Sequence, residues 1–186
     1  MRKSEHTELA TLSRLAVLAS REGLSSISYG SAAAAAHLSK GAMQRLFPDK
    51  AALQATVLTH AVKLMRAHIF EYDHIQSLNF EFVHARWADW ISGDAGLPGG
   101  CVLLAAAASR GYSPALQRAI SAALEQLLSD LSMLAIQKKI IAPHDIARFK
   151  AQQLGLALEL HVAQFLFPLN RESHAQRKVE FAALKS

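Results

Sequence analysis

Residues 37–53 of the chain read HLSKGAMQRLFPDKAAL, and this stretch decides how the first third of the sequence folds. Ser39 is a favourable N-cap for a short helix over about residues 40–46, because its hydroxyl can accept a hydrogen bond from a backbone N–H of the first turn. Pro48 ends that helix, and Asp49 can cap a long helix that follows. The stretch therefore predicts a turn, a short helix and the start of a long one.

The residues before this stretch predict two more helices. Apolar side chains recur at helical spacing over residues 9–19, with Leu9 on the buried face, and Gly23 is a natural stop for this first helix. Ser28 can cap a second helix that contains the alanine run. Only His37 and Leu38 separate that helix from the next one. Two short helices joined by so tight a link are typical of a helix-turn-helix.

The positive charge of the chain lies in the same region. Residues 1–66 contain nine Lys and Arg against four Asp and Glu, whereas residues 67–186 contain eleven of each. The whole net charge of +5 therefore belongs to the first third. A localised basic excess suits a polyanion such as nucleic acid, while ordinary surface charge for solubility is the alternative that this count leaves open.

Composition excludes several classes of protein. Hydrophobic residues make up 51% of the chain and charged residues 19%, which is enough to bury a sizeable core and argues against general disorder. The single cysteine, Cys101, rules out an internal disulfide framework. No apolar run follows the charged N-terminus, and the longest uncharged apolar stretch, residues 95–109, is too short to span a bilayer. We therefore expect a cytoplasmic protein with no membrane partner.

Helical spacing continues to the end of the chain, and no strand-like alternation persists. The sequence thus predicts an all-α fold. Further helices are expected over about residues 78–92, 101–109, 114–137, 143–167 and 174–185.

Residues 23–58 resemble the N-terminal helix-turn-helix of the TetR family of bacterial transcription regulators. The matching features are Gly23, Ser28, the triplet Ser39-Lys40-Gly41, Phe47-Pro48, and Lys50 with Leu53. The resemblance implies a three-helix DNA-binding domain over residues 1–50. A long helix would join it to an antiparallel helical bundle over residues 51–186 that binds a ligand and dimerises. It also implies a ligand-responsive regulator, with repression as the expected sign, that needs no cofactor.

The expected partner is a double-stranded DNA operator. Gln44 and Arg45 are suited to read adenine and guanine edges, whereas Lys40 and Lys50 would contact phosphates and carry little sequence information. Gly41 would let the helix approach DNA closely. The full set of expected DNA contacts is Ser28, Ser39, Lys40, Gly41, Ala42, Gln44, Arg45 and Lys50.

The sequence departs from the family pattern at four positions. Ala19 and Ala32 stand where larger residues are typical, so a thin core is expected in the DNA-binding domain. His37 stands where the family usually has glycine in the turn, and Gln44 stands where an aromatic residue, usually tyrosine, is common. These departures leave the operator open. They also keep a second hypothesis, a TetR-like helical protein without sequence-specific DNA binding that acts through a ligand or through protein contacts.

A ligand pocket, if the second domain has one, is expected between residues 78–92 and the segment CVLLAAAA. Its expected lining is His84, Trp87, Trp90, Ile91, Cys101 and Leu104. A small apolar or aromatic effector would fit there, with His84 as the polar anchor. Residues at this spacing also commonly form ordinary core, and the sequence leaves both interpretations open.

The resemblance further implies a homodimer through the last two long helices, over residues 114–137 and 143–167. A two-fold dimer would set two recognition helices about 34–36 Å apart, or a small multiple of that distance.

An enzyme is the remaining alternative, and the sequence offers little for it. Glu81 and His84 match the Glu-x-x-His motif of di-iron bundles, but such a site needs two of these motifs and two further glutamates. A helical metal enzyme is therefore the weakest hypothesis. We expect no catalytic residues and no metal site.

Overall fold

The computed structural model describes residues 3–70 and 78–166, and within these ranges the chain is all-α, as the sequence predicts. No β-strand occurs in these ranges. The helix expected over residues 174–185 lies outside the described residues. The helices are α1 (Lys3–Glu22), α2 (Tyr29–Ala36), α3 (Lys40–Leu46), α4 (Lys50–Phe70), α5 (Phe80–Ser92), α6 (Val102–Ala108), α7 (Pro114–Gln137) and α8 (Ile146–Leu166), with 3-10 turns η1 (Leu24–Ser26) and η3 (Pro143–Asp145).

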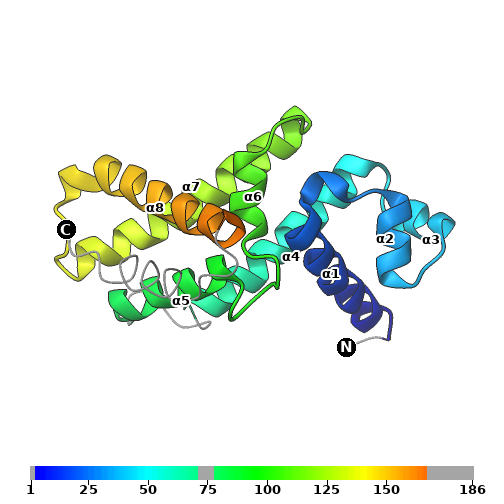
Figure 1. Ribbon diagram of the computed structural model, residues 1–186, viewed down its shortest axis with the longest axis horizontal. Helices are drawn as coiled ribbons and strands as arrows, with labels where there is room; N and C mark the ends of the chain where they lie inside the picture. The colour runs from blue at the N-terminus through cyan, green and yellow to red at the C-terminus, as the bar shows by residue number, and fades with distance from the viewer. Residues whose placement is uncertain (1–2, 71–77, 167–186) are drawn as a thin grey trace.

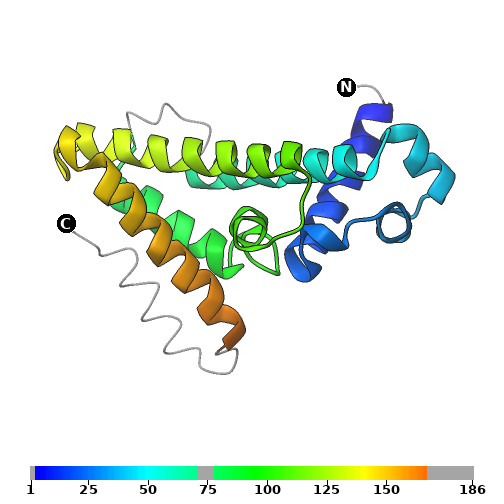
Figure 2. The ribbon, with the colours of Figure 1, turned by 90° about the horizontal axis from the view of Figure 1, so that it is seen from above.

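Helices α1 to α3 lie at one end of the molecule, and α5, α7 and α8 lie at the other (Figure 1). Helix α4 joins the two groups, since it packs against α1 in the first and against α5 and α7 in the second. Seen from above, α7 runs beside α4, while α8 diverges from α7 beyond their connection (Figure 2). The short helix α6 contacts α1, α4, α7 and α8, so it lies where the two groups meet.

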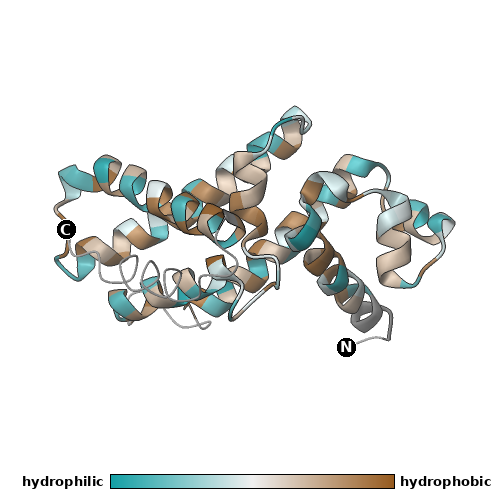
Figure 3. Cartoon of the chain, in the orientation of Figure 1, coloured by the Kyte–Doolittle hydropathy of each residue, from teal (hydrophilic) through white to brown (hydrophobic). Residues whose placement is uncertain are grey.

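The buried apolar side chains form one continuous cluster that extends through both groups. It includes Leu15 of α1, Val57 of α4, Trp87 of α5, Leu104 of α6 and Leu131 of α7. Hydrophobic residues concentrate along α6 and the adjoining parts of its neighbours (Figure 3). Burial of this apolar surface fixes α1 against α4 and α6, because the hydrophobic effect scales with the area removed from water.

The predicted N-caps of the first half are confirmed. Ser28 Oγ accepts from the Ser31 N–H at 3.2 Å, and Ser39 Oγ accepts from the Ala42 N–H at 3.1 Å. Asp49 Oδ1 accepts from the N–H of the third residue of α4 at 2.7 Å. Side-chain caps of this kind satisfy N–H groups that the helix itself cannot pair, which explains why the three helices begin where the sequence predicts.

Two details of the sequence prediction are wrong. Leu9 is 42% exposed, because the N-terminal turns of α1 project beyond the helices that cover its later residues (Figure 1). Pro143 begins the 3-10 turn η3 and not α8, which starts three residues later at Ile146. A proline fits either start, since it needs no N–H partner in a first turn.

The loop between α5 and α6 holds the two groups of helices together. The Gly99 N–H donates to Ser20 Oγ at the end of α1, with 3.2 Å between the atoms. A Cβ on Gly99 would lie 2.0 Å from the Ser20 carbonyl oxygen. Gly100 has a positive φ of 83°, and a Cβ there would lie 2.5 Å from the side chain of Gln164 in α8. The two glycines therefore let the loop fit between the ends of α1 and α8.

A half-buried ion pair links α4 to α7. Arg66 Nη1 lies 2.5 Å from Asp130 Oδ2, and Gln126 Nε2 donates to the other carboxylate oxygen at 2.9 Å. The Arg66 guanidinium also lies over the Phe70 ring, 5.2 Å from its centroid.

By length and composition alone α7 could cross a membrane, a test that the core helix of a soluble protein also passes.

Candidate functional site

The turn between α2 and α3 has the geometry of a helix-turn-helix link. His37 ends α2 in the left-handed conformation, with φ 57° and ψ 41°. Its N–H donates to Ala34 O at 3.3 Å, and the Leu38 N–H donates to Ala33 O at 2.9 Å. These bonds satisfy the last carbonyls of α2, which is the usual task of a glycine at this position. A side chain in this conformation costs roughly 1–2 kcal/mol, so the turn forms despite His37.

Three long-range hydrogen bonds hold the turn and its helices in place. Arg14 Nη1 donates to Ala36 O at the end of α2 at 3.3 Å. The Tyr29 hydroxyl donates to Phe47 O at the end of α3 at 3.0 Å. Gln54 Nε2 donates to Leu24 O at 3.0 Å, which joins α4 to η1. None of these three bonds could be predicted from the sequence, since partners 18 to 30 residues apart leave no spacing pattern.

The surface of α3 separates buried from exposed side chains. Met43 is fully buried, while Lys40, Gly41, Gln44 and Arg45 are exposed. Among the other expected contacts, Ser39 and Lys50 are exposed, and Ser28 and Ala42 are partly buried. The hydroxyls of Ser28 and Ser39 are both engaged in helix caps. The structure thus brings the expected residues together at one end of the molecule. The polar side chains of α3 among them, Lys40, Gln44 and Arg45, are exposed to solvent.

The positively charged side chains of this surface are exposed. Within residues 3–70 and 78–166, no carboxylate lies within ion-pair distance of Lys40, Arg45 or Lys50. Lys50 Nζ donates to a backbone carbonyl, Ser25 O, at 3.4 Å. Three exposed positive charges on and beside one short helix, without a carboxylate partner in the described part of the chain, create a local positive potential that attracts anions. We call the exposed residues Lys40, Gly41, Gln44, Arg45 and Lys50 the α3 surface.

The residues expected to line a ligand pocket lie together, but they are packed in the core. His84, Trp87 and Ile91 are fully buried, and Trp90, Cys101 and Leu104 are buried as well. The imidazole of His84 stacks on the Phe80 ring at 5.2 Å between centroids and meets the Trp87 ring edge-on at 6.0 Å. These contacts are those of close-packed side chains.

A cavity of about 280 Å³ lies next to this cluster, where α7 connects to α8. It shares one wall with the expected pocket, because Gln153 lines the cavity and its Oε1 is hydrogen-bonded to Nε2 of His84. We call it the α7–α8 cavity, and its lining is Ile140, Ile141, Asp145, Arg148, Phe149, Gln152 and Gln153. These residues were not expected from the sequence, although the polar pair Gln152-Gln153 in a largely apolar helix is a signal that could have indicated them.

Cys101 is chemically protected. Burial raises the pKa of its thiol to about 11, so the thiol stays protonated at neutral pH. Its Sγ lies 3.8 Å from Met65 Sδ.

Glu81 is exposed and His84 is buried, so these two do not face a common site. No group of three or more His, Cys, Asp or Glu residues in the described part of the chain could hold a metal ion.

No protein-family model and no curated protein matches this chain.

Proposed function

We propose that the protein is a dimeric, ligand-responsive DNA-binding regulator of the TetR type, which represses transcription until a small molecule releases it from its operator. The α3 surface is the observation that carries this proposal. It combines two groups suited to base edges, Gln44 and Arg45, with two lysines at phosphate-binding positions. A capped turn supports it on one side, and a core of Met43 and Phe47 supports it on the other.

The geometry of the turn supports insertion of α3 into a major groove. Helix α3 contacts α2 and stands at the outer end of the molecule, away from the second group of helices (Figure 1). Its hydrogen-bonded supports, from Arg14 to Ala36 and from Tyr29 to Phe47, fix the orientation of α3 relative to α1 and α2. A rigid support matters because base recognition requires the reading side chains to be held in a set geometry.

Exposed apolar side chains on α7 and α8 support the dimer. Met133 is 63% exposed on α7, and Phe165 is 57% exposed on α8, where Val162 is exposed as well. Val162 and Phe165 lie three residues apart on α8, and exposed apolar side chains at this spacing form a surface that a second protein can cover. A second copy of the chain would bury them and would place two α3 surfaces on one DNA duplex.

The test begins with selection of bound fragments from random DNA, followed by a salt titration on the selected site. In a two-fold dimer Lys40 and Lys50 supply about four phosphate contacts, so the logarithm of the binding constant should fall with the logarithm of salt at a slope of about −3.6. Raising the salt from about 50 to about 200 mM should then weaken binding roughly 150-fold. Failure to select any preferred site at low salt would refute sequence-specific regulation.

Two variants separate the roles within the α3 surface. Lys50→Ala should weaken binding to all sequences and reduce the salt slope by about one per protomer, whereas Gln44→Ala should mainly relax the sequence preference. Lys63→Ala is the matched control, because Lys63 is an exposed lysine of the same helix as Lys50 but lies more than three turns further along it. Identical effects of Lys50→Ala and Gln44→Ala would overturn the assigned roles.

The dimer has a separate test. Phe165→Glu should shift the protein from dimer to monomer in sedimentation velocity, because a charge cannot be buried in an apolar interface without a partner. Phe82→Glu replaces an exposed phenylalanine on α5 and should leave the dimer intact. A dimer that persists unchanged in Phe165→Glu would place the interface elsewhere.

A further inference from the structure

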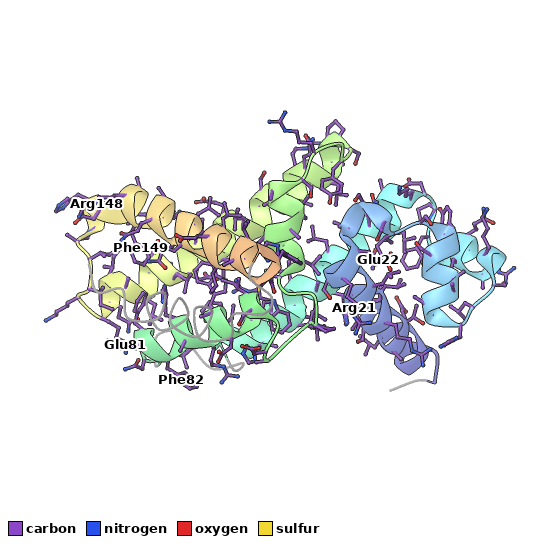
Figure 4. The ribbon with its side chains drawn as sticks, viewed as in Figure 1. Arg21, Glu22, Glu81, Phe82, Arg148 and Phe149 are labelled. Carbon is purple, nitrogen blue, oxygen red and sulfur yellow. The ribbon has the colours of Figure 1, made fainter. Side chains whose placement is uncertain are left out.

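The α7–α8 cavity has one apolar wall and one polar wall. Ile140 and Ile141, from the connection after α7, form part of the apolar wall with Phe149, which is buried. Gln152 and Gln153 of α8 supply amide groups. Figure 4 shows Arg148 and Phe149 side by side at the start of α8, at the end of the molecule away from α1. A concave site with apolar walls and a few polar groups is the usual form of a small-molecule site.

The volume of the cavity limits the size of its ligand. A cavity of about 150 Å³ with apolar walls holds one benzene ring. The α7–α8 cavity, at about 280 Å³, has room for one substituted ring or two fused rings. The flat ring of Phe149 offers such a ligand a stacking surface, because aromatic rings attract one another when they stack with an offset or meet edge to face.

The charges around the cavity compensate each other. Arg148 Nη2 lies 3.0 Å from Asp145 Oδ1, and His144 Nε2 lies 3.6 Å from the other oxygen of the same carboxylate. Arg148 is 79% exposed, so its charge is largely solvated at the outer edge of the cavity. The Asp145 carboxylate would repel an anionic ligand. A cationic ligand would have to displace Arg148 from its ion pair with Asp145. The lining therefore favours a ligand without net charge.

Gln153 supplies the specific polar contact. Its side chain is 2% exposed, and its Oε1 is paired with Nε2 of His84. The Nε2 atom of the same amide has no hydrogen-bond partner among the residues that the structure describes. This Nε2 atom is not one of the fully buried polar atoms without a partner, so it is accessible to water or to a ligand, and a ligand acceptor can replace the hydrogen bond that it makes to water. Because Gln153 lines the cavity, a ligand in the cavity can supply this acceptor.

We propose that the α7–α8 cavity binds a small, uncharged aromatic molecule that presents one hydrogen-bond acceptor, such as a carbonyl oxygen, to Nε2 of Gln153. The ring stacks on Phe149, and the isoleucines close the cavity over it. This site lies beside the packed cluster around Trp87 and is lined by different residues. It provides the ligand site that the proposed regulator requires, but binding at the cavity can be measured without DNA.

The test uses acetophenone as the probe, isopropenylbenzene as a probe of the same shape without an acceptor, and benzoate as an anionic probe. Isothermal titration of the full chain should give one acetophenone per chain, with at least tenfold weaker binding of the other two probes. Gln153→Glu keeps an acceptor for His84 but removes the donor, and should weaken acetophenone binding about tenfold. Ile141→Trp fills the cavity from a half-buried position and should abolish binding.

Gln117→Leu, on the exposed surface of α7, is the control and should bind acetophenone like the parent protein. Thermal melts confirm that each variant is folded before its titration is interpreted. Absence of saturable binding in the parent protein, or binding that survives Ile141→Trp, would overturn the proposal, and so would equal affinity for the three probes. A protein that binds acetophenone but selects no DNA site would retain this cavity and lose the proposed regulatory function.

Discussion

Gly99→Ala tests whether the loop between α5 and α6 holds the two groups of helices together. The added Cβ would lie 2.0 Å from the Ser20 carbonyl oxygen and 2.5 Å from the Arg21 backbone nitrogen. Ordinary contact begins at 3.4 Å, so the loop must retreat from α1 by about 1.4 Å. The obstacle is backbone at the end of a helix, which cannot rotate away as a side chain could. The Gly99 N–H would then also lose its bond to Ser20 Oγ.

Overpacking of this kind costs about 3 kcal/mol, the upper end of the usual range, because the clash involves backbone atoms. For a chain of 186 residues this lowers the melting temperature by about 6–12 °C. The assay is thermal unfolding followed by circular dichroism, with urea unfolding as a second measure of stability. Gly30→Ala is the matched control, since its Cβ would meet nothing nearer than 3.9 Å, and it should be neutral or stabilise by about 0.4–1 kcal/mol. Equal melting temperatures for Gly99→Ala and the parent protein would refute the close approach.

Three further predictions concern the turn, the ion pair and the histidines. His37→Gly should raise the free energy of unfolding by about 0.5–1 kcal/mol in urea titrations, because glycine removes the strain of a positive φ but also loses more entropy on folding. Asp130→Asn should lower it by about 1.5–3 kcal/mol, because the half-buried Arg66 then faces a neutral amide; an unchanged midpoint would show that water already replaces the pair. Burial, with a smaller effect of Lys63, lowers the pKa of His60, and burial lowers that of His161. The stability that these neutral histidines contribute is present above pH 6.5 and is lost as the pH falls through their folded-state pKa values, so the melting temperature should fall between pH 7 and pH 5. His161→Gln should make this fall shallower.

Local rules account for what the sequence predicts well. The boundaries of α2, α3 and α4 follow from Ser28, Ser39 and Asp49, whose side chains bond backbone N–H groups only three residues away. The burial of α6 follows from its uninterrupted apolar run. Such contacts depend on neighbours in the chain, so the sequence alone contains the information that specifies them.

The contacts that the sequence analysis missed join residues far apart in the chain. Arg66 and Asp130 are separated by 64 positions, and His84 and Gln153 by 69, so no local pattern links either pair. The cavity shows the same limit. Helical spacing places Trp87 and Ile91 on a buried face, but it cannot tell whether that face is filled or hollow, because the answer depends on how α8 packs against α5.

Helix α8 offers a physical connection between the cavity and the α3 surface. Gln153 lines the cavity near the start of α8, and Gln164 lies against Gly100 near its end. Eleven residues of helix separate them, or about 16 Å at 1.5 Å per residue. Because a helix moves largely as one body, a ligand that displaces the start of α8 also displaces the contact at Gly100.

From that loop the connection continues into α1. Gly99 contacts Ser20 at the end of α1, and Arg14 of the same helix bonds the last carbonyl of α2. A ligand changes DNA affinity only if it binds the two arrangements of these helices unequally. Gly99→Ala displaces the loop in the middle of this connection and leaves the cavity intact. If α8 transmits the response, Gly99→Ala should retain acetophenone binding but weaken the effect of acetophenone on DNA affinity. An undiminished effect in that variant would mean that the response travels through α4 instead.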